Sequence, residues 1–374
     1  MQSLHQLIQA FAASNRIPIH VSTYANAWPE VANIMLYRIG PDVSEVGSTW
    51  VKSLAATNSL LPLPPYMLKA QGGQTAFATP PAYGDDGQIY SIPFQVETRL
   101  VFYRRDLLAA AGVDESNAFT SPENFLNTLA ALSNHGSPHP LLLPISDRWL
   151  HLSCAASWVW GAGGDFIAPN SKRVIFDQEA ALRGLAGFFS AARYIAPDTL
   201  TISDYTQRFG RGSGAVTLGG PWVSDYLFND SAVSPTVRDS VGIALPPGPT
   251  YQGSTHLVIW KHTPKASLAM DLVRYMTGSH FQAEWVSSVL PARCEVLQSP
   301  LYAGHPIYKI MIDATLSGRS YSSSSLWGIV EDRLSKALRE IWPECLQDLR
   351  VPPADILAER LPLLARRINL TLEA

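Results

Sequence analysis

The sequence has few charged residues, few cysteines and no cluster of one charge. Charged residues make up 16% of the 374 residues and the formal net charge is −3, whereas a charged fraction of about 25% is usual. No run of Lys or Arg occurs, which argues against nucleic acid and anionic lipid as partners. Cys154, Cys294 and Cys345 are odd in number and far apart, so they form neither a disulfide framework nor a zinc spacing.

Long apolar runs are also absent. No stretch approaches the roughly 18 uninterrupted apolar residues of a membrane span. The start of the chain lacks the features of an export signal, because the first Lys or Arg is Arg16 and no continuous apolar run precedes it. Leu4, Leu7, Ile8 and Phe11 repeat with helical spacing instead, which predicts an amphipathic helix of a folded domain over residues 1–14.

Motifs of several catalytic classes are missing. No glycine is followed by lysine, which excludes a Walker loop, and no HExxH, GxSxG or SxxK pattern occurs. Gly161-Ala162-Gly163 begins like a dinucleotide fingerprint, but Phe166 occupies its third glycine position. His135 and His139 are separated by a glycine and a proline that break the helix needed to align them. We therefore expect no catalytic residue, no cofactor and no metal site.

The chain is rich in aromatic and apolar residues. It has 10 Trp, 14 Tyr and 13 Phe, and 47% of its residues are apolar. This composition suits a large core, and surplus rings can line a ligand cleft. The length suggests two domains, at about 150 residues each.

Strand and helix patterns alternate near the start of the chain, with strands expected at 17–21 and 41–46 and helices at 28–39 and 48–57. This alternation predicts α/β architecture with parallel sheets. Ser121-Pro122-Glu123 is typical of a helix start. Further helices are expected at 104–111, 122–134, 149–160, 178–193, 265–277, 279–288, 326–341 and 354–370, and strands at 141–145, 173–176, 214–218, 240–244 and 255–260.

Two extended segments suggest a chain that passes between two lobes and returns. They lie around residues 97–103 and 246–255. From them we expect an N-terminal lobe of residues 1–98 plus 254–296. The C-terminal lobe is then residues 99–253 plus 297–374. Such crossings are typical of a binding protein that bends at a hinge.

An ordered set of short motifs runs through the same segments. The motifs are Pro41-Asp42-Val43 with Trp50 and Leu60–Leu63, Ile92-Pro93-Phe94 through Tyr103–Leu108, Gly214-Ala215-Val216 with Gly220-Pro221-Trp222, Gly253-Ser254 before Leu257–Ile259, and Leu290–Arg293. In this order the set resembles the extracellular solute-binding proteins of family 1, which bind sugars for ABC transporters.

The resemblance implies a two-lobed fold of the periplasmic-binding-protein type II, with a sheet flanked by helices in each lobe and a ligand cleft between them. It also implies hinge closure on a sugar, an ABC transporter permease as partner and an extracytoplasmic location. We further expect a monomer. The chain departs from the family where Gly47 replaces a carboxylate and Thr255 replaces a tryptophan. The missing export signal leaves a cytoplasmic or truncated form open.

A sugar-binding site needs flat rings for C–H faces and polar groups for hydroxyls. Gln95 and Glu97 are alternate residues, so on a strand both point to one face. They also match ligand-contacting positions of the family, although a solvent-facing pair is the alternative. Trp222 follows a Gly-Gly-Pro turn and matches a tryptophan that stacks on sugar, with a core position as the alternative.

Other candidates rest on weaker patterns. Trp158 and Trp160 are two apart, so one is expected in the core and the other at the cleft. Ser48 and Thr49 open a predicted helix where a strand ends, where Ser48 can equally be a helix cap. The remaining candidates are Gly253, Ser254 and Thr255, which can offer backbone amides or form a flexible crossing, and Arg293 and Trp327.

Two other functions remain open at this stage. The chain can be the ligand-sensing module of a larger regulatory protein. It can also be a glycoside-processing enzyme that pairs Glu97 with Asp165, Asp204 or Asp225.

Overall fold

The computed structural model describes residues 3–24, 27–147, 150–169, 173–196, 198, 201–285, 288–322, 324–325 and 327–373. The chain forms two compact units, which are described one at a time. Unit 1 comprises Met1–Glu97, Gly253–Ile312 and Ser323–Gly328. Unit 2 comprises Thr98–Gln252, Asp313–Ser322 and Ile329–Ala374.

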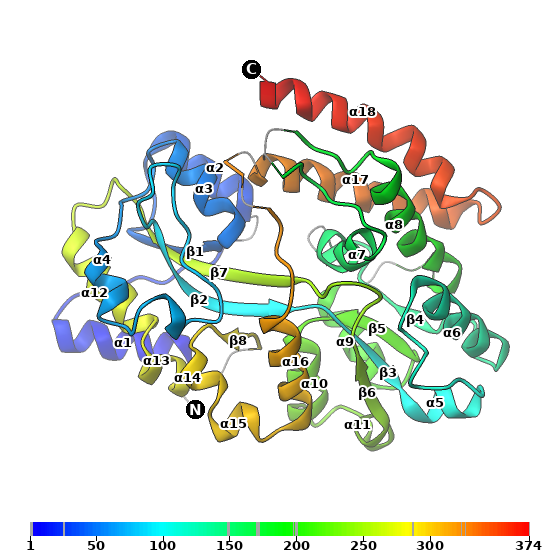
Figure 1. The fold of residues 1–374 in the computed structure, drawn as a ribbon. Helices are drawn as coiled ribbons and strands as arrows, with labels where there is room; N and C mark the ends of the chain where they lie inside the picture. The colour runs from blue at the N-terminus through cyan, green and yellow to red at the C-terminus, as the bar shows by residue number, and fades with distance from the viewer. Residues whose placement is uncertain are drawn as a thin grey trace. The chain divides into compact units, whose positions relative to one another are not determined.

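Unit 1 is built on a sheet of four strands in the order β1-β7-β2-β8 (Figure 1). The strands are β1 (Val43–Gly47), β7 (Gln252–Ile259), β2 (Ser91–Thr98) and β8 (Leu290–Pro291). β1 pairs antiparallel with β7, so that Gly47 lies opposite Thr255. β2 is buried along most of its length and pairs antiparallel with β8.

Helices of unit 1 bury their apolar faces against the rest of the unit. In the first helix, Leu7, Ile8 and Phe11 are buried, and the Phe11 ring lies 5.0 Å from the Tyr275 ring of α12. The predicted amphipathic helix is therefore confirmed. The helical segments are α1 (Leu4–Asn15), α2 (Ala27–Tyr37), α3 (Ser48–Ala56), α4 (Pro65–Lys69), η1 (Gln74–Ala76), α12 (Ala266–Met276), α13 (Ser279–Glu284), α14 (Cys294–Leu297), α15 (Pro300–Ala303) and α16 (Pro306–Leu316), whose last residues belong to unit 2.

Unit 2 has its own sheet, in the order β4-β5-β3-β6. The strands are β4 (Leu141–Leu142), β5 (Val216–Gly219), β3 (Leu100–Arg104) and β6 (Val241–Ala244). β3 is wholly buried and pairs antiparallel with both neighbours. The helical segments of unit 2 are α5 (Arg105–Ala110), α6 (Pro122–Asn134), α7 (Leu150–Gly161), α8 (Glu179–Phe189), η2 (Ser190–Tyr194), α9 (Ile202–Gly210), α10 (Pro221–Asn229), α11 (Pro235–Ser240), most of α17 (Trp327–Gln347) and α18 (Pro353–Glu373).

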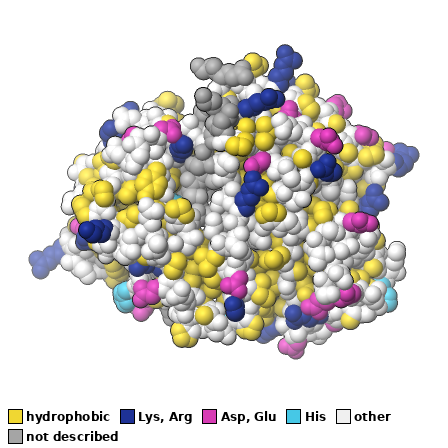
Figure 2. Space-filling model, viewed as in Figure 1, with side chains coloured by type: hydrophobic (Ala, Val, Ile, Leu, Met, Phe, Trp, Pro, Cys, Tyr) yellow, Lys and Arg dark blue, Asp and Glu magenta, His cyan; other side chains and the backbone are white. Residues whose placement is uncertain are grey.

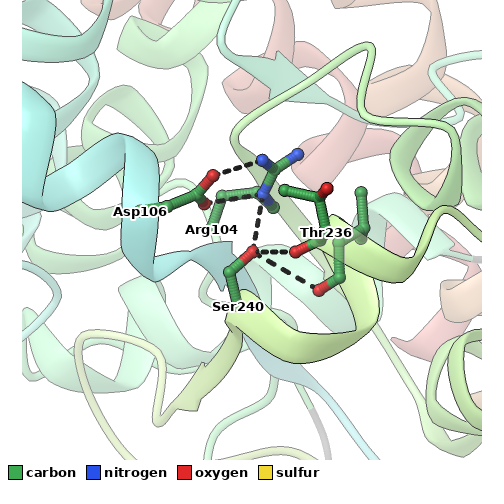
Figure 3. Close-up of polar contacts among 5 residues, drawn as sticks. Arg104, Asp106, Thr236 and Ser240 are labelled. Atoms are coloured by element: carbon green, nitrogen blue, oxygen red, sulfur yellow. Dashed lines mark hydrogen bonds and ion pairs between the residues drawn. The ribbon is translucent and has the colours of Figure 1, made fainter.

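Arg104, the last residue of β3, ties the sheet to two helices (Figure 3). Its Nε donates to Asp106 Oδ1 at 2.7 Å and to Ser240 Oγ at 2.9 Å. The hydrogen bond from Arg104 lowers the pKa of the Asp106 carboxyl. Because Asp106 lies in the first turn of α5 and Ser240 ends α11, this buried guanidinium joins three elements.

The α/β class, with a sheet and flanking helices in each unit, is confirmed, but several sequence predictions are wrong. The sheets are not parallel: β4 and β5 form a parallel pair, whereas β1–β7, β2–β8, β3–β5 and β3–β6 are antiparallel. Residues 17–21 are not a strand, because Pro18 lacks an N–H and the segment lies largely exposed. Residues 173–176 provide only an isolated bridge between Val174 and Ile167.

The units also differ from the expected lobes in two segments. Residues 297–312 and 323–328 belong to unit 1, although the sequence placed them in the C-terminal lobe. The motif Leu290–Arg293 lies just before residue 297, where the C-terminal lobe was expected to resume. Leu290–Pro291 pairs with β2 inside unit 1, and the following α14 packs against η1 and α13.

The described residues contain no helix that is both long and apolar enough to span a membrane, and no group of three or more His, Cys, Asp or Glu placed to hold a metal ion. On the face seen in Figure 2, Lys and Arg side chains are interspersed with Asp and Glu.

Candidate ligand-binding site

Trp222 is the second residue of α10 in unit 2 and remains half-buried rather than enclosed in the core. Gly220 and Pro221 place it there, because Gly220 is the helix N-cap and Pro221 begins the helix. A Cβ on Gly220 would lie 2.2 Å from Cζ3 of the Trp222 ring. Only glycine therefore lets the indole lie this close to the backbone.

Two neighbours fix the orientation of the Trp222 ring. The indole Nε1 donates to the hydroxyl of the buried Tyr205 at 2.8 Å. Burial raises the pKa of Tyr205, so this hydroxyl stays neutral. On the ring itself, the Arg99 guanidinium carbon lies 4.8 Å from the centroid, a cation–π distance.

Arg99 is itself held in place between β2 and β3. Its Nε donates to Ser153 Oγ and its Nη1 to the carbonyl of Thr98, both at 3.0 Å. The guanidinium also lies 5.2 Å from the Tyr251 ring. Trp222 is therefore a preorganised ring, which suits stacking on an apolar sugar face.

In unit 1, polar side chains gather on the sheet. Gln95 and Glu97 lie on β2, where Gln95 is buried and Glu97 is partly exposed. Glu45 on β1 accepts a hydrogen bond from Thr255 Oγ1 on β7. Although Glu45 keeps solvent-accessible surface, desolvation by surrounding protein raises its pKa; the Thr255 hydrogen bond opposes this, and the Glu97 charge adds to it.

The sequence did not point to Glu45, Tyr205, Arg99 or Tyr251. Glu45 is an exposed acid in a strand whose neighbours Ser44 and Val46 are buried. That alternation is the one signal in the sequence that could have suggested it, because it places the carboxylate on the open face. Its partner Thr255 is 210 residues away and could not have been named.

Five predicted residues lie in α3 and β7, the elements that follow and pair with β1. Ser48 is the first residue of α3, but Gly47 is the N-cap, so Ser48 is not the helix cap. Thr49 follows in the same turn and is partly exposed. Gly253, Ser254 and Thr255 belong to β7, and the chain passes from unit 2 to unit 1 between Gln252 and Gly253, so the crossing lies in a strand rather than in a loop.

Three of the predicted ligand residues, Trp158, Arg293 and Trp327, are buried. Trp158 is 1% exposed and packs edge-on against Phe188, so its ring has no free face for a ligand. The Arg293 guanidinium donates to the Gln71 carbonyl at 2.8 Å and to Ser279, and it lies over the Phe77 ring. Trp327 is fully buried.

The acids considered for a glycosidase pair also have local partners. Asp204 forms a capping box with Thr201 at the start of α9. Asp225 accepts a hydrogen bond from Asn229 at 2.8 Å. Asp165 accepts from Trp160 Nε1 at 3.2 Å and pairs with Arg319 at 2.6 Å.

Solved structures of sugar-binding proteins share this fold. A solute-binding protein from Thermotoga lettingae, bound with α-D-tagatose, has a TM-score of 0.80 at 18% identity, covering 98% of this chain and 95% of that chain. Maltose-bound MalE3 of T. maritima has a TM-score of 0.78 at 18% identity, covering 96% and 95%. The two units are thus those of a two-domain binding-protein fold.

Sequence comparison gives the family. The profile described as bacterial extracellular solute-binding protein matches residues 6–310. The chain is also 22% identical over 307 residues to the diacetylchitobiose binding protein DasA of Streptomyces coelicolor, covering 78% of this chain and 69% of that protein. This chain belongs to the bacterial extracellular solute-binding proteins, as the ordered motifs indicated.

Proposed function

We propose that this protein binds a small carbohydrate outside the cytoplasm and delivers it, as a monomer and without reaction, to the permease of an ABC transporter. The observation that carries the proposal is the Trp222 ring, held by Tyr205 and Arg99 and partly open to solvent. Such a ring offers contact area at low entropic cost. The relatives that bind diacetylchitobiose, tagatose and maltose support the same ligand class.

Glu97 and Gln95 are the proposed polar ligand groups of unit 1, with Glu45 and Thr255 on the same sheet. Carboxylates and amides bind sugar hydroxyls through strong hydrogen bonds that fix orientation. Ser48, Thr49, Gly253 and Ser254 are proposed to border the ligand.

A thermal-shift screen of the full chain tests this function. The probes are tagatose, maltose, diacetylchitobiose and related mono- and disaccharides, with peptides and polyamines as negative arms. At a concentration of about 100 Kd, the bound sugar should raise the Tm by roughly 5–10 °C. A shift with peptides or polyamines but with no sugar would overturn the proposal.

Two further measurements address the alternatives. Release of new reducing ends from oligosaccharides during incubation would identify an enzyme and contradict binding without reaction. A regulatory domain encoded next to this sequence would favour the sensing module over the transport component.

A further inference from the structure

Trp160, Asp165 and Arg319 form a second cluster of polar and aromatic side chains in unit 2. Trp160, at the end of α7, donates from Nε1 to Asp165 Oδ1 at 3.2 Å. The second oxygen of Asp165 pairs with Arg319 Nη2 at 2.6 Å. The Arg319 guanidinium lies 4.9 Å from the centroid of the Trp160 ring, so each of the three side chains contacts the other two.

Two backbone hydrogen bonds join Arg319 to the segment of residues 250–252. Its N–H donates to the Thr250 carbonyl at 2.7 Å, and its carbonyl accepts from the Gln252 N–H at 2.9 Å. A Cβ on Gly318 would lie 2.9 Å from the Ala314 carbonyl and 3.0 Å from that of Thr250. Glycine therefore permits the close approach that fixes Arg319 before any ligand binds.

The charged heads of this cluster are accessible, whereas the ring beneath is not. The side chains of Arg319 and Asp165 are 42% and 21% exposed, but Trp160 is 5% exposed. Among the described residues, Arg319 makes no side-chain hydrogen bond other than the one to Asp165. Its remaining N–H groups and the Asp165 carboxylate can bind hydroxyls through charge-assisted hydrogen bonds.

The cluster is connected to the Trp222 ring through a run of side chains. The Trp160 ring lies 5.7 Å from Tyr321, which lies 5.2 Å from Tyr251. Arg99 contacts Tyr251 at 5.2 Å and Trp222 at 4.8 Å. Tyr251 and Tyr321 are 9% and 6% exposed, so the accessible groups are at the two ends of the run.

We propose that Arg319 and Asp165, supported by Trp160, form a second sugar subsite, and that the ligand is an oligosaccharide that also reaches Trp222. This inference rests on the proposed function. Because Arg99, Tyr251 and Tyr321 separate Trp222 from the Arg319 cluster, we expect one sugar ring on Trp222 not to reach Arg319 and a chain of rings to reach it. Arg319 lies beyond residue 310, where the match to the family profile ends.

Affinity as a function of sugar length tests the subsite. The full chain and R319A are titrated by calorimetry with glucose, maltose and maltotriose, and with N-acetylglucosamine, diacetylchitobiose and triacetylchitotriose. In the series that binds, we expect the wild-type Kd to fall at least 10-fold from the single ring to the longest sugar. R319A should weaken the longest sugar about 10-fold and change the monosaccharide less than twofold. R319K, which keeps the charge, should recover part of this loss.

R105A is the matched control, because Arg105 is 52% exposed and pairs with Glu115 at 2.9 Å in the same unit. It should leave every Kd unchanged. If wild type binds sugar and W222A weakens it, but R319A is neutral or weakens all lengths equally, the subsite is overturned and the proposed function stands. If wild type binds no sugar, both are overturned.

Discussion

Arg99 and Arg104 are two buried arginines on one extended stretch of chain in unit 2, and their guanidinium groups have different surroundings. Arg104 bonds a carboxylate and a hydroxyl and joins β3, α5 and α11. Arg99 bonds the Ser153 hydroxyl and a backbone carbonyl, and it lies over the rings of Trp222 and Tyr251.

Under the proposed function, Arg104 is a structural arginine and Arg99 supports a ligand surface. A carboxylate partner satisfies the charge of Arg104 within the fold. Arg99 instead lies over the half-buried Trp222 indole, part of which is accessible to solvent. Substitutions around Arg99 should therefore change affinity, and substitutions around Arg104 should change stability.

The largest expected effect is on sugar affinity, from removal of the Trp222 ring that Arg99 contacts. W222A should raise the Kd for the sugar at least 30-fold, because removal of a central stacking ring costs about 2 kcal/mol or more. Its Tm should change little, since the ring is half-buried. Calorimetric titration and thermal unfolding measure the two quantities, and an unchanged Kd would remove Trp222 from the site.

His256 on β7 is a third buried basic side chain. Unlike the charged Arg99 and Arg104, its imidazole is kept neutral by burial. Burial lowers its pKa to about 3, while Ser91 Oγ lies 2.8 Å from its Nδ1. The unfolded chain takes up a proton near pH 6.5 and the folded chain does not, so stability is full above that pH and falls on acidification towards pH 3. Between pH 7 and pH 5 the free energy of unfolding should drop by about 2 kcal/mol from this residue.

Denaturant unfolding at both pH values measures this drop. H256N keeps a donor close to Nδ1 without titrating, so its pH dependence should be shallower. An equal slope in wild type and H256N would show that His256 is not the source.

On the Arg104 side, R104Q should lower the free energy of unfolding by about 1.5 kcal/mol, because it removes charge-assisted hydrogen bonds to Asp106 and Ser240. The Kd for sugar should stay within twofold of wild type. Denaturant unfolding and calorimetry test both parts. A marked loss of affinity with no loss of stability would break the comparison.

The smallest effect should come from single hydroxyl groups. Y205F removes the acceptor of the Trp222 indole and should raise the Kd about 5-fold, or about 1 kcal/mol. In a W222F background the same change should have no effect, since Tyr205 acts through the indole. Y103F is the control, because it removes a hydroxyl that donates to Glu115 at 2.6 Å. Equal effects of Y205F and Y103F on Kd would contradict a positioning role.

Local sequence patterns were sufficient to predict where several helices begin. Ser121 and Pro122 begin α6 as predicted, and the Gly-Gly-Pro turn before Trp222 places that residue at a helix start. These features depend on neighbours within a few residues, where caps, φ restrictions and periodicity act. The ordered motifs also indicated the family.

Tertiary structure decided strand direction and side-chain partners. The pairing of β1 with β7, the contact of Glu45 with Thr255 and that of Asp165 with Arg319 join residues more than 150 positions apart. The sequence offered both Trp158 and Trp222 as ligand candidates, yet one is enclosed by Phe125 and Phe188 and the other lies half-buried beside Gly220. Which ring stays accessible depends on how distant elements pack, and no local pattern encodes that packing.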